Sequence, residues 1–247
     1  MFPARAFAPF MLAAALGCAP AARQVPSAAP TPTDGASYPT ELRWVRTSAE
    51  YRALVLQIYR EAGGHLVSAS HGLTRGSWAV ILDLDETMID NSEYQKQLGA
   101  AHARYSDSSW ARWVREDATP ALPGVVEFTR QVHALGGRVA IVTNHAESLC
   151  DVTRKHLVAL GVEADLVLCQ QPGSGDKNSR FRLIQSGGAA PGMPALNVIE
   201  WIGDNIQDFP NLTQGARNDP ALLAEFGKKY FAVPNPMYGS WEKNPEQ

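Results

Sequence analysis

The chain has 247 residues, of which 45% are hydrophobic and 19% charged, and its formal net charge at pH 7 is −3. A chain of this length and composition buries one sizeable core, so we expect one globular domain with a modest insertion and not two full domains. The sequence contains no run of lysine and arginine and no basic stripe with aromatic residues, so nucleic-acid polymers are excluded as partners.

The first residues are typical of an export signal. Arg5 precedes a short apolar stretch over 7–16, which is too short to span a membrane as a mature helix. Ala15-Leu16-Gly17-Cys18 then looks like a lipoprotein processing box, although Ala15 stands where such boxes usually carry Leu. We predict that a signal peptide over 1–17 is removed and that Cys18 carries a lipid anchor at the outer membrane or cell surface. Cleavage over 19–22, which would release a soluble periplasmic or secreted protein, is the alternative.

A proline-rich segment follows the signal. Residues 19–40 contain five prolines and six alanines and almost no large apolar side chains. This composition is typical of an extended tether and not of a core. We therefore expect a tether over 18–40 and a globular domain over 41–247.

The globular part begins with a helical pattern. Thr47-x-x-Glu50 is typical of a capping box, and apolar residues recur at helical spacing over 51–62. Apolar runs then alternate with helical patterns, which predicts a Rossmann-like α/β fold with a parallel sheet covered by helices on both faces. The predicted strands cover 78–84, 138–143, 165–169, 198–203 and 230–233, and the predicted helices between them cover 125–135, 148–160 and 222–228.

Residues 90–122 interrupt this alternation and predict a small helical cap after the first strand. The aromatic residues Tyr94, Trp110 and Trp113 of this segment either line the mouth of a crevice or fix the cap to the body.

Besides Cys18, the chain has only two cysteines, Cys150 and Cys169. Two cysteines are too few for a disulfide framework, and we expect two separate buried thiols. A disulfide between them is the alternative, because both residues would lie near the same edge of the sheet.

Two acids, Asp83 and Asp85, stand at the end of the first predicted strand. The carboxyl ends of parallel strands form the ligand crevice of open α/β sheets, and side chains two residues apart on a strand point to the same side. The two carboxylates can therefore converge on one reacting centre or on one hard cation such as Mg²⁺. An isolated Asp-x-Asp is more often a helix cap or an acidic loop, so the rest of the sequence has to decide.

Three further signals fall on the same edge of the predicted sheet. Thr143-Asn144 ends the second strand, and Lys177 lies in the loop region after the third. Gly203-Asp204-Asn205, with Asp208, follows the fourth strand. Acids, a hydroxyl group and an amine at one edge favour a catalytic site over a chance arrangement.

These residues resemble, in their usual order, the four motifs of the haloacid dehalogenase superfamily. More closely, the chain is similar to the class C nonspecific acid phosphatases, which are bacterial surface lipoproteins of that superfamily. The similarity covers nearly all of residues 42–243. It is carried by Leu82-Asp83-Leu84-Asp85-Glu86-Thr87-Met88-Ile89-Asp90-Asn91-Ser92, Trp201-Ile202-Gly203-Asp204-Asn205-Ile206-Gln207-Asp208-Phe209, Trp44-x-x-x-Ser48-x-Glu50-Tyr51-x-Ala53-Leu54 and Asn235-Pro236-Met237-Tyr238-Gly239-x-Trp241-Glu242.

The resemblance implies a Mg²⁺-dependent phosphatase. Asp83 would be the nucleophile that forms an aspartyl-phosphate, and Asp85 would be the general acid and base. The carboxylates of Asp83 and Asp204 and the backbone carbonyl of Asp85 would hold the cation. Asp208 would orient the metal or its waters. The residues assigned to the phosphate are Thr87, Thr143, Asn144 and Lys177.

Some alternatives stay open at this point. Arg180 or Arg182 can share the function of Lys177, and His145 stands where relatives often carry Arg, which puts affinity at this position in doubt. Asp85 separates the chain from dehalogenases, which need no proton donor there, but not from phosphotransferases that use the same intermediate. A surface lipoprotein that binds nucleotides or another ligand with little catalysis is the alternative from another class.

The expected partners are small phosphomonoesters. Tyr94, Trp113 and Tyr238 are candidates to stack a nucleobase or an aryl ring, which favours 5'-nucleotides and aryl phosphates as substrates. The physiological substrate and the oligomeric state, a homodimer included, are not determined by the sequence.

Overall fold

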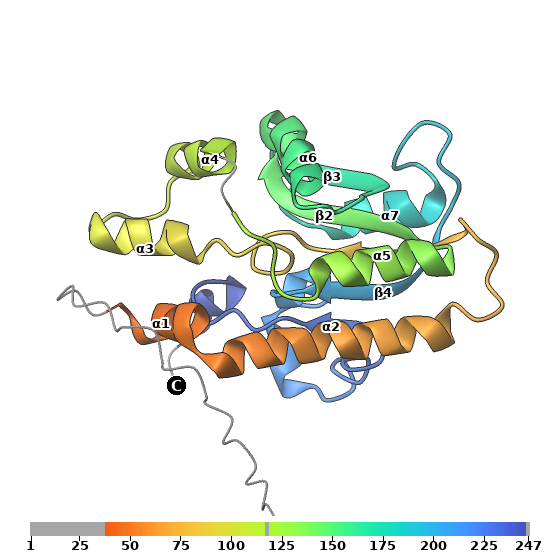
Figure 1. Ribbon diagram of the computed structural model, residues 1–247, viewed down its shortest axis with the longest axis horizontal. Helices are drawn as coiled ribbons and strands as arrows, with labels where there is room; N and C mark the ends of the chain where they lie inside the picture. The colour runs from red at the N-terminus through yellow and green to blue at the C-terminus, as the bar shows by residue number, and fades with distance from the viewer. Residues whose placement is uncertain (1–37, 117–118, 246–247) are drawn as a thin grey trace, which may run out of the picture. The chain divides into compact units, whose positions relative to one another are not determined.

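The protein is described by a computed structural model that covers residues 38–116 and 119–245 (Figure 1). The predictions for the signal peptide, for Cys18 and for most of the tether lie outside these residues. Within the described ranges, no helix combines the length and the apolar character that a membrane span requires.

Strands and helices alternate along the described chain. The strands are β1 (Trp78–Leu82), β2 (Arg138–Ala146), β3 (Leu166–Gln170), β4 (Asn197–Gly203) and β5 (Tyr230–Ala232). The α-helices are α1 (Thr40–Thr47), α2 (Ala49–Ala69), α3 (Ser92–Ala100), α4 (Asp107–Glu116), α5 (Val125–Leu135), α6 (Cys150–Ala159) and α7 (Asn178–Ser186). Four short 3₁₀ helices complete the described ranges: η1 (Glu147–Leu149), η2 (Ile206–Asp208), η3 (Gln214–Asn218) and η4 (Ser240–Lys243).

The strands form a parallel sheet in the order β3-β2-β1-β4-β5, with β1 at its centre. All five residues of β1 are buried. Val80 and Leu82 pack into the core that α2 and α5 cover, whereas Ala79 and Ile81 pack into a second core that includes residues of α7. A strand that is buried on both faces has a continuous apolar sequence, which is why the run before Asp83 predicts it well.

The cap predicted after the first strand consists of α3 and α4, which stand apart from the sheet in Figure 1. An antiparallel bridge between Ile89 and Ala121 joins the two ends of this insertion. The N–H of Asp90 donates to the carbonyl of Pro120 at 3.0 Å, next to that bridge. The cap is therefore attached to the domain directly beyond the carboxyl end of β1.

The start of the long helix differs from the predicted capping box. Thr47 is the last residue of α1, and Ser48 caps α2 by accepting the N–H of Tyr51 on its side-chain oxygen at 3.0 Å. The chain is already helical at Thr47, so the capping position moves to the next residue that has a hydroxyl group.

The helix predicted over 222–228 is wrong. This segment forms successive turns, in which Leu222 donates its N–H to the carbonyl of Asp219 and Gly227 adopts a left-handed conformation at φ 77°. Phe226 packs edge-on against Phe209 with 4.7 Å between ring centroids. The segment therefore forms turns in place of the expected helix, and Phe226 packs against a residue distant in sequence.

The two cysteines form a disulfide, so the expectation of two separate thiols is wrong. Cys150 begins α6 and Cys169 lies near the end of β3, and their Cα atoms are 5.9 Å apart. Because β2 and β3 are neighbouring parallel strands and α6 starts just after β2, the first turn of α6 lies next to the end of β3. The alternative pairing therefore holds.

Candidate active site

The register of the sheet places Asp83 at the carboxyl edge between two neighbouring strands. Leu82 pairs with Ile141 of β2 and with Ile202 of β4. The N–H of Asp83 continues this ladder by donating to the carbonyl of Ile202 at 2.9 Å. The Asp83 carboxyl group, only 8% exposed as a residue, therefore lies at the base of a cleft at this edge.

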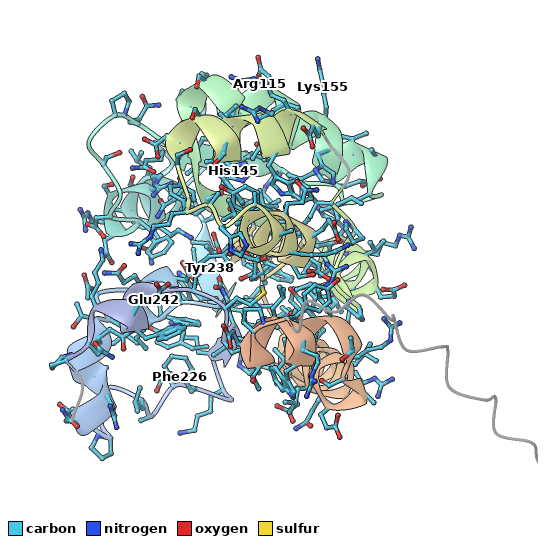
Figure 2. The ribbon with its side chains drawn as sticks, turned by 90° about the vertical axis from the view of Figure 1, so that its left-hand side faces the viewer. Arg115, His145, Lys155, Phe226, Tyr238 and Glu242 are labelled. Atoms are coloured by element: carbon cyan, nitrogen blue, oxygen red, sulfur yellow. A yellow bond between two sulfur atoms is a disulfide. The ribbon has the colours of Figure 1, made fainter. Side chains whose placement is uncertain are left out.

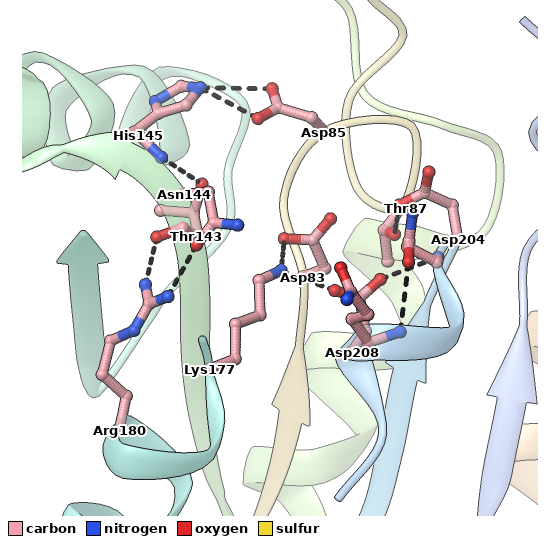
Figure 3. A network of polar contacts seen from close by, with 12 residues as sticks. Asp83, Asp85, Thr87, Thr143, Asn144, His145, Lys177, Arg180, Asp204 and Asp208 are labelled. Atoms are coloured by element: carbon pink, nitrogen blue, oxygen red, sulfur yellow. Dashed lines mark hydrogen bonds and ion pairs between the residues drawn. The ribbon is translucent and has the colours of Figure 1, made fainter. Parts of the chain in front are cut away.

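Lys177 lies between Asp83 and Asp208 (Figure 3). Its Nζ donates to both carboxylates, with 2.7 Å to Oδ1 of Asp208. Carboxylate oxygens of Asp83, Asp204 and Asp208 all lie within 4.8 Å of one another. The structure thus brings together the predicted residues from β1, from the start of α7 and from the loop after β4.

Asp204 is held by two further side chains. Thr87 Oγ1 donates to Oδ1 of Asp204 at 3.2 Å, and Asn235 Nδ2 donates to Oδ2 at 2.9 Å. Thr87, which the sequence analysis assigns to the phosphate, is fully buried, and its hydroxyl group is used in this contact with Asp204. Its carbonyl accepts a hydrogen bond from Tyr59 at 2.6 Å, which fixes the residue from the other side.

The position before Asp204 has no room for a side chain, and Gly203 occupies it. A Cβ atom on Gly203 would lie 2.3 Å from Cβ of Asp208, a distance that real contacts do not reach. Asp208 folds back over this position, and its Oδ2 accepts the N–H of Asn205 at 2.8 Å. Glycine therefore allows the second acid of the motif to reach the site.

The cluster of Asp83, Asp204, Asp208 and Lys177 buries more acidic groups than basic ones. Burial raises the pKa of Asp83 to about 6, with Asp208 and Asp85 adding to the rise and Lys177 opposing it. Burial also raises the pKa of Asp204 well above its usual range. Burial alone would lower the pKa of Lys177, but Asp208 and Asp83 outweigh that effect and raise it. One amine thus faces three carboxyl groups.

These three carboxyl groups fit a divalent cation. They offer hard oxygen ligands on converging side chains, the donor type that Mg²⁺ takes in proteins. A cation at this point would favour their ionised forms and offset the cost of burying them together.

Thr143 and Asn144 lie on the other side of Lys177. Asn144 lines the cleft, whereas Thr143 is buried and its Oγ1 accepts the N–H of His145 at 3.1 Å. Arg180 donates to the carbonyl of Thr143 and, at 2.6 Å, to Oδ1 of Asn144 (Figure 3). Arg180 therefore holds the two residues that were assigned to the phosphate.

Asp85 lies outside the cluster of acids and has different partners. Nε2 of His145 lies 3.2 and 3.1 Å from its two carboxylate oxygens, and Asn91 Nδ2 donates to Oδ1 at 2.9 Å. Burial would lower the pKa of His145, but the Asp85 carboxylate outweighs burial and raises it. The sequence analysis questioned substrate affinity at His145, because relatives often carry Arg there. In the structure His145 is buried and contacts Asp85.

A cleft of about 780 Å³ separates the cap from the carboxyl edge of the sheet. Tyr94 and Trp110 line it from the cap. Tyr238, labelled in Figure 2, lines it from the C-terminal segment. Trp113, predicted to contact substrate, does not line this cleft; it is buried, and its Nε1 donates to Oδ1 of Asn91 at 2.8 Å. Tyr94 is 4% exposed and packs edge-on against Trp110, so Trp110 is the more accessible ring.

Several residues at the site escaped the sequence analysis. Asn91 and Asn235 contact Asp85 and Asp204, and both stand inside the motifs that carry the family resemblance, which was the signal available for them. Tyr105 lines the cleft and is 58% exposed, yet nothing local distinguishes it from any loop tyrosine.

Comparisons with known proteins identify the family of the chain. The family model "HAD superfamily, subfamily IIIB (Acid phosphatase)" matches residues 2–241. Acid phosphatase 1 of Solanum lycopersicum is 28% identical over 191 residues, which are 76% of this chain and 69% of that protein. The class C acid phosphatase of Bacillus anthracis superposes with a TM-score of 0.73 and 30% identity, over 82% of this chain and 85% of that one. A second structure of that enzyme, with tungstate bound, has the same TM-score and coverage at 28% identity. The chain therefore belongs to subfamily IIIB of the haloacid dehalogenase superfamily, the acid phosphatases, and is a hydrolase of phosphomonoesters.

Proposed function

We propose that the protein is a Mg²⁺-dependent acid phosphatase that hydrolyses phosphomonoesters through an aspartyl-phosphate on Asp83. One observation carries this proposal: Asp83 and Asp85 open onto the same cleft but have different surroundings. Asp83 lies among Lys177 and two other carboxyl groups, whereas Asp85 lies outside that cluster and contacts His145 and Asn91. Two carboxyl groups in unlike environments suit two different tasks.

The reaction takes two displacements. Lys177 donates to Oδ1 of Asp83, which leaves Oδ2 to attack phosphorus while the bond from phosphorus to the leaving oxygen breaks. Asp85 gives its proton to that oxygen. A water molecule then attacks the phosphorus of the aspartyl-phosphate and loses a proton to Asp85, and the bond to Asp83 breaks, so that phosphate leaves and both acids return to their first state.

The phosphate oxygens need donors and positive charge. Thr143 accepts one hydrogen bond on its hydroxyl oxygen and keeps its own hydrogen for a phosphate oxygen. Arg180 binds the carbonyl end of the Asn144 amide, so the NH₂ end is free to face the cleft. Lys177 supplies an ammonium charge at the nucleophile.

Phosphatases of this superfamily generally use a divalent metal ion. Asp83, Asp204 and the backbone carbonyl of Asp85 would hold Mg²⁺, with Asp208 orienting it. When bound, the ion would lower the repulsion between the carboxylate nucleophile and an anionic phosphate. The side-chain contacts of Thr87 and Asn235 keep Asp204 turned toward that position.

The substrates we infer are 5'-nucleotides and aryl phosphates. Trp110 and Tyr238 line the cleft from two sides, and the cleft is large enough for a base or an aryl group beside the phosphate. Tyr94 packs edge-on against Trp110, with 5.1 Å between ring centroids.

A phosphate-release assay tests the proposal. The purified protein is given a nucleotide or phenyl phosphate at mildly acidic pH, with Mg²⁺ or with a chelator. We expect release that requires the metal, and Asp83→Asn should lower turnover by about 10³-fold or more. Mass spectrometry of the acid-quenched enzyme should detect phosphate on Asp83.

Asp151→Asn is the matched control, because Asp151 is an exposed acid that pairs with Arg154 on the surface. It should retain full activity. Full turnover of Asp83→Asn, indifference to the chelator, or capture of the nucleotide without release of phosphate would each contradict the proposal.

We also infer that the enzyme is exported and anchored to the outer membrane or cell surface by a lipid on Cys18. The support is the apolar stretch and the processing box in the sequence. The phosphatase would then act on small substrates outside the cytoplasm, at the end of a proline-rich tether.

A further inference from the structure

The contacts of Asp85 are unusual for a group that has to move a proton, because the protein surrounds its carboxyl group with two side chains from different elements. Asn91 Nδ2 donates to Oδ1 at 2.9 Å, and Nε2 of His145 lies 3.1 Å from Oδ2. The residue Asn91 is 1% exposed and His145 is 3% exposed. Both partners are therefore buried, while the Asp85 side chain is 19% exposed and faces the cleft.

Asn91 is oriented by the cap. Its Oδ1 accepts the indole N–H of Trp113, in α4, at 2.8 Å, and its backbone N–H donates to Glu86 at 2.9 Å. With the carbonyl end of the amide bound to Trp113, the NH₂ end has to face Asp85. A side chain of the cap thereby determines which hydrogen-bonding group meets the carboxyl group.

The proton on His145 is placed by Thr153. Nδ1 of His145 lies 2.8 Å from Thr153 Oγ1, and this hydroxyl donates to the carbonyl of Leu149 at 2.9 Å. A hydroxyl group has one hydrogen, so at the contact with His145 it accepts and the imidazole Nδ1 donates. Nε2 then meets Asp85 either as an acceptor from a protonated carboxyl group or as the donor of an imidazolium to a carboxylate.

Both arrangements place one proton between Nε2 and the Asp85 carboxyl group. Thr153 and Asp85 hold the two nitrogens of the imidazole ring, and Trp110 packs edge-on against it with 5.7 Å between ring centroids. A cavity of about 10 Å³ beside Asn91, Trp113 and His145 has room for at most about one water molecule.

We propose that His145 is a positioning residue for Asp85: it shares with Asp85 the proton that goes to the leaving group, and Asn91, set by Trp113, holds the same carboxyl group from the cap. The proposal rests on the proposed phosphatase function. During the first displacement the proton leaves the shared hydrogen bond for the leaving oxygen as the bond from phosphorus to oxygen breaks. During the second, a proton from the attacking water restores it.

The dependence on the leaving group tests this proposal. A dinitrophenolate leaves without a proton, whereas phenolate needs one, so damage to proton delivery affects phenyl phosphate selectively. For His145→Gln, which keeps a donor but cannot carry the proton, we expect kcat/KM to fall about 100-fold with phenyl phosphate and less than about 3-fold with dinitrophenyl phosphate. Thr153→Val removes the acceptor at Nδ1. It should lower kcat/KM about 3- to 10-fold with phenyl phosphate and leave the value with dinitrophenyl phosphate nearly unchanged.

His133→Gln is the matched control. His133 Nε2 lies 2.8 Å from Asp165, an equivalent imidazole–carboxylate contact at the amino edge of the sheet, outside the cleft. It should leave both rates unchanged. Thermal unfolding shows whether each variant is folded, and Thr153→Val carries the test if His145→Gln does not fold.

An equal loss with both substrates, or no loss, in the folded variants would overturn the proposal. The function itself fails by a different result: wild-type protein that releases no phosphate from dinitrophenyl phosphate, or Asp83→Asn that releases it at the wild-type rate. A selective loss in Thr153→Val alongside an inactive Asp83→Asn supports both.

Discussion

Arg180 is a buried arginine that points into the protein and not toward the cleft. Its guanidinium group binds the carbonyl of Thr143 and Oδ1 of Asn144, two groups 36 and 37 residues away in sequence. A planar group with several donors can bind both acceptors at once. The positions of the backbone at Thr143 and of the amide at Asn144 therefore depend on one side chain from α7.

Arg180→Lys should separate charge from geometry. A lysine keeps the positive charge but cannot bind both acceptors, so we expect kcat/KM for phenyl phosphate to fall by about 10- to 100-fold, since small misplacements near the reacting atoms cost that much. A buried carbonyl without a donor should lower the free energy of unfolding by about 1–3 kcal/mol. Steady-state kinetics and denaturant unfolding measure both, with Arg182→Lys, an exposed neighbour, as the control. Unchanged kinetics would show that Arg180 does not position these groups.

At the scale of elements, β4 contains a buried acid that the site does not use. Glu200 has no exposed surface, and its Oε2 lies 3.1 Å from Nδ1 of His65 in α2. Among the described residues its Oε1 has no hydrogen-bond partner. Burial raises the pKa of Glu200 to about 9, and burial, with a smaller effect of Lys229, lowers the pKa of His65. Both partners are therefore neutral near neutral pH.

Glu200→Gln should make the protein more stable at alkaline pH. The pKa of Glu200 is higher in the folded state than its ordinary value of 4.5. Its contribution to the free energy of unfolding is therefore fully present below pH 4.5 and is lost as the pH rises through about 9. Glutamine does not ionise, so near pH 8 the variant should be roughly 2–4 kcal/mol more stable, a difference that should disappear toward pH 4.5. Denaturant unfolding across this pH range measures it, and Glu61→Gln, on the exposed side of α2, should show no such trend. A difference that does not vary with pH would contradict a neutral Glu200.

At the scale of the whole molecule, hydrogen bonds connect the cap to the catalytic edge of the sheet. The bridge between Ile89 and Ala121 joins the two ends of the cap insertion, and Trp113 connects α4 to Asp85 through Asn91. The disulfide joins α6 to β3 on the same side of the sheet as the cleft. The proposed anchor, Cys18, precedes these residues in the sequence, so anchoring and catalysis should be separable.

Cys18→Ser tests that separation. Expressed with its signal in a bacterium that processes lipoproteins, the wild-type protein should incorporate labelled fatty acid and sediment with membranes. The variant should do neither, because serine has no thiol for the lipid, while its kcat/KM should stay unchanged. Ser27→Ala, in the same tether, is the control. Lipid labelling that persists in Cys18→Ser would contradict the anchor.

The sequence alone determined the parallel α/β fold, the position of the cap and the edge at which Asp83, Asp204 and Lys177 meet, because buried runs and strand ends are local patterns. It did not determine the pairing of Cys150 with Cys169 or the turns over 222–228. The actual contacts of Thr87, Trp113, Arg180 and His145 likewise emerged only in three dimensions. Tertiary structure decided these features because hydrogen-bond and packing partners distant in sequence become neighbours only after the elements pack, and the cost of leaving buried polar groups unpaired then selects their contacts.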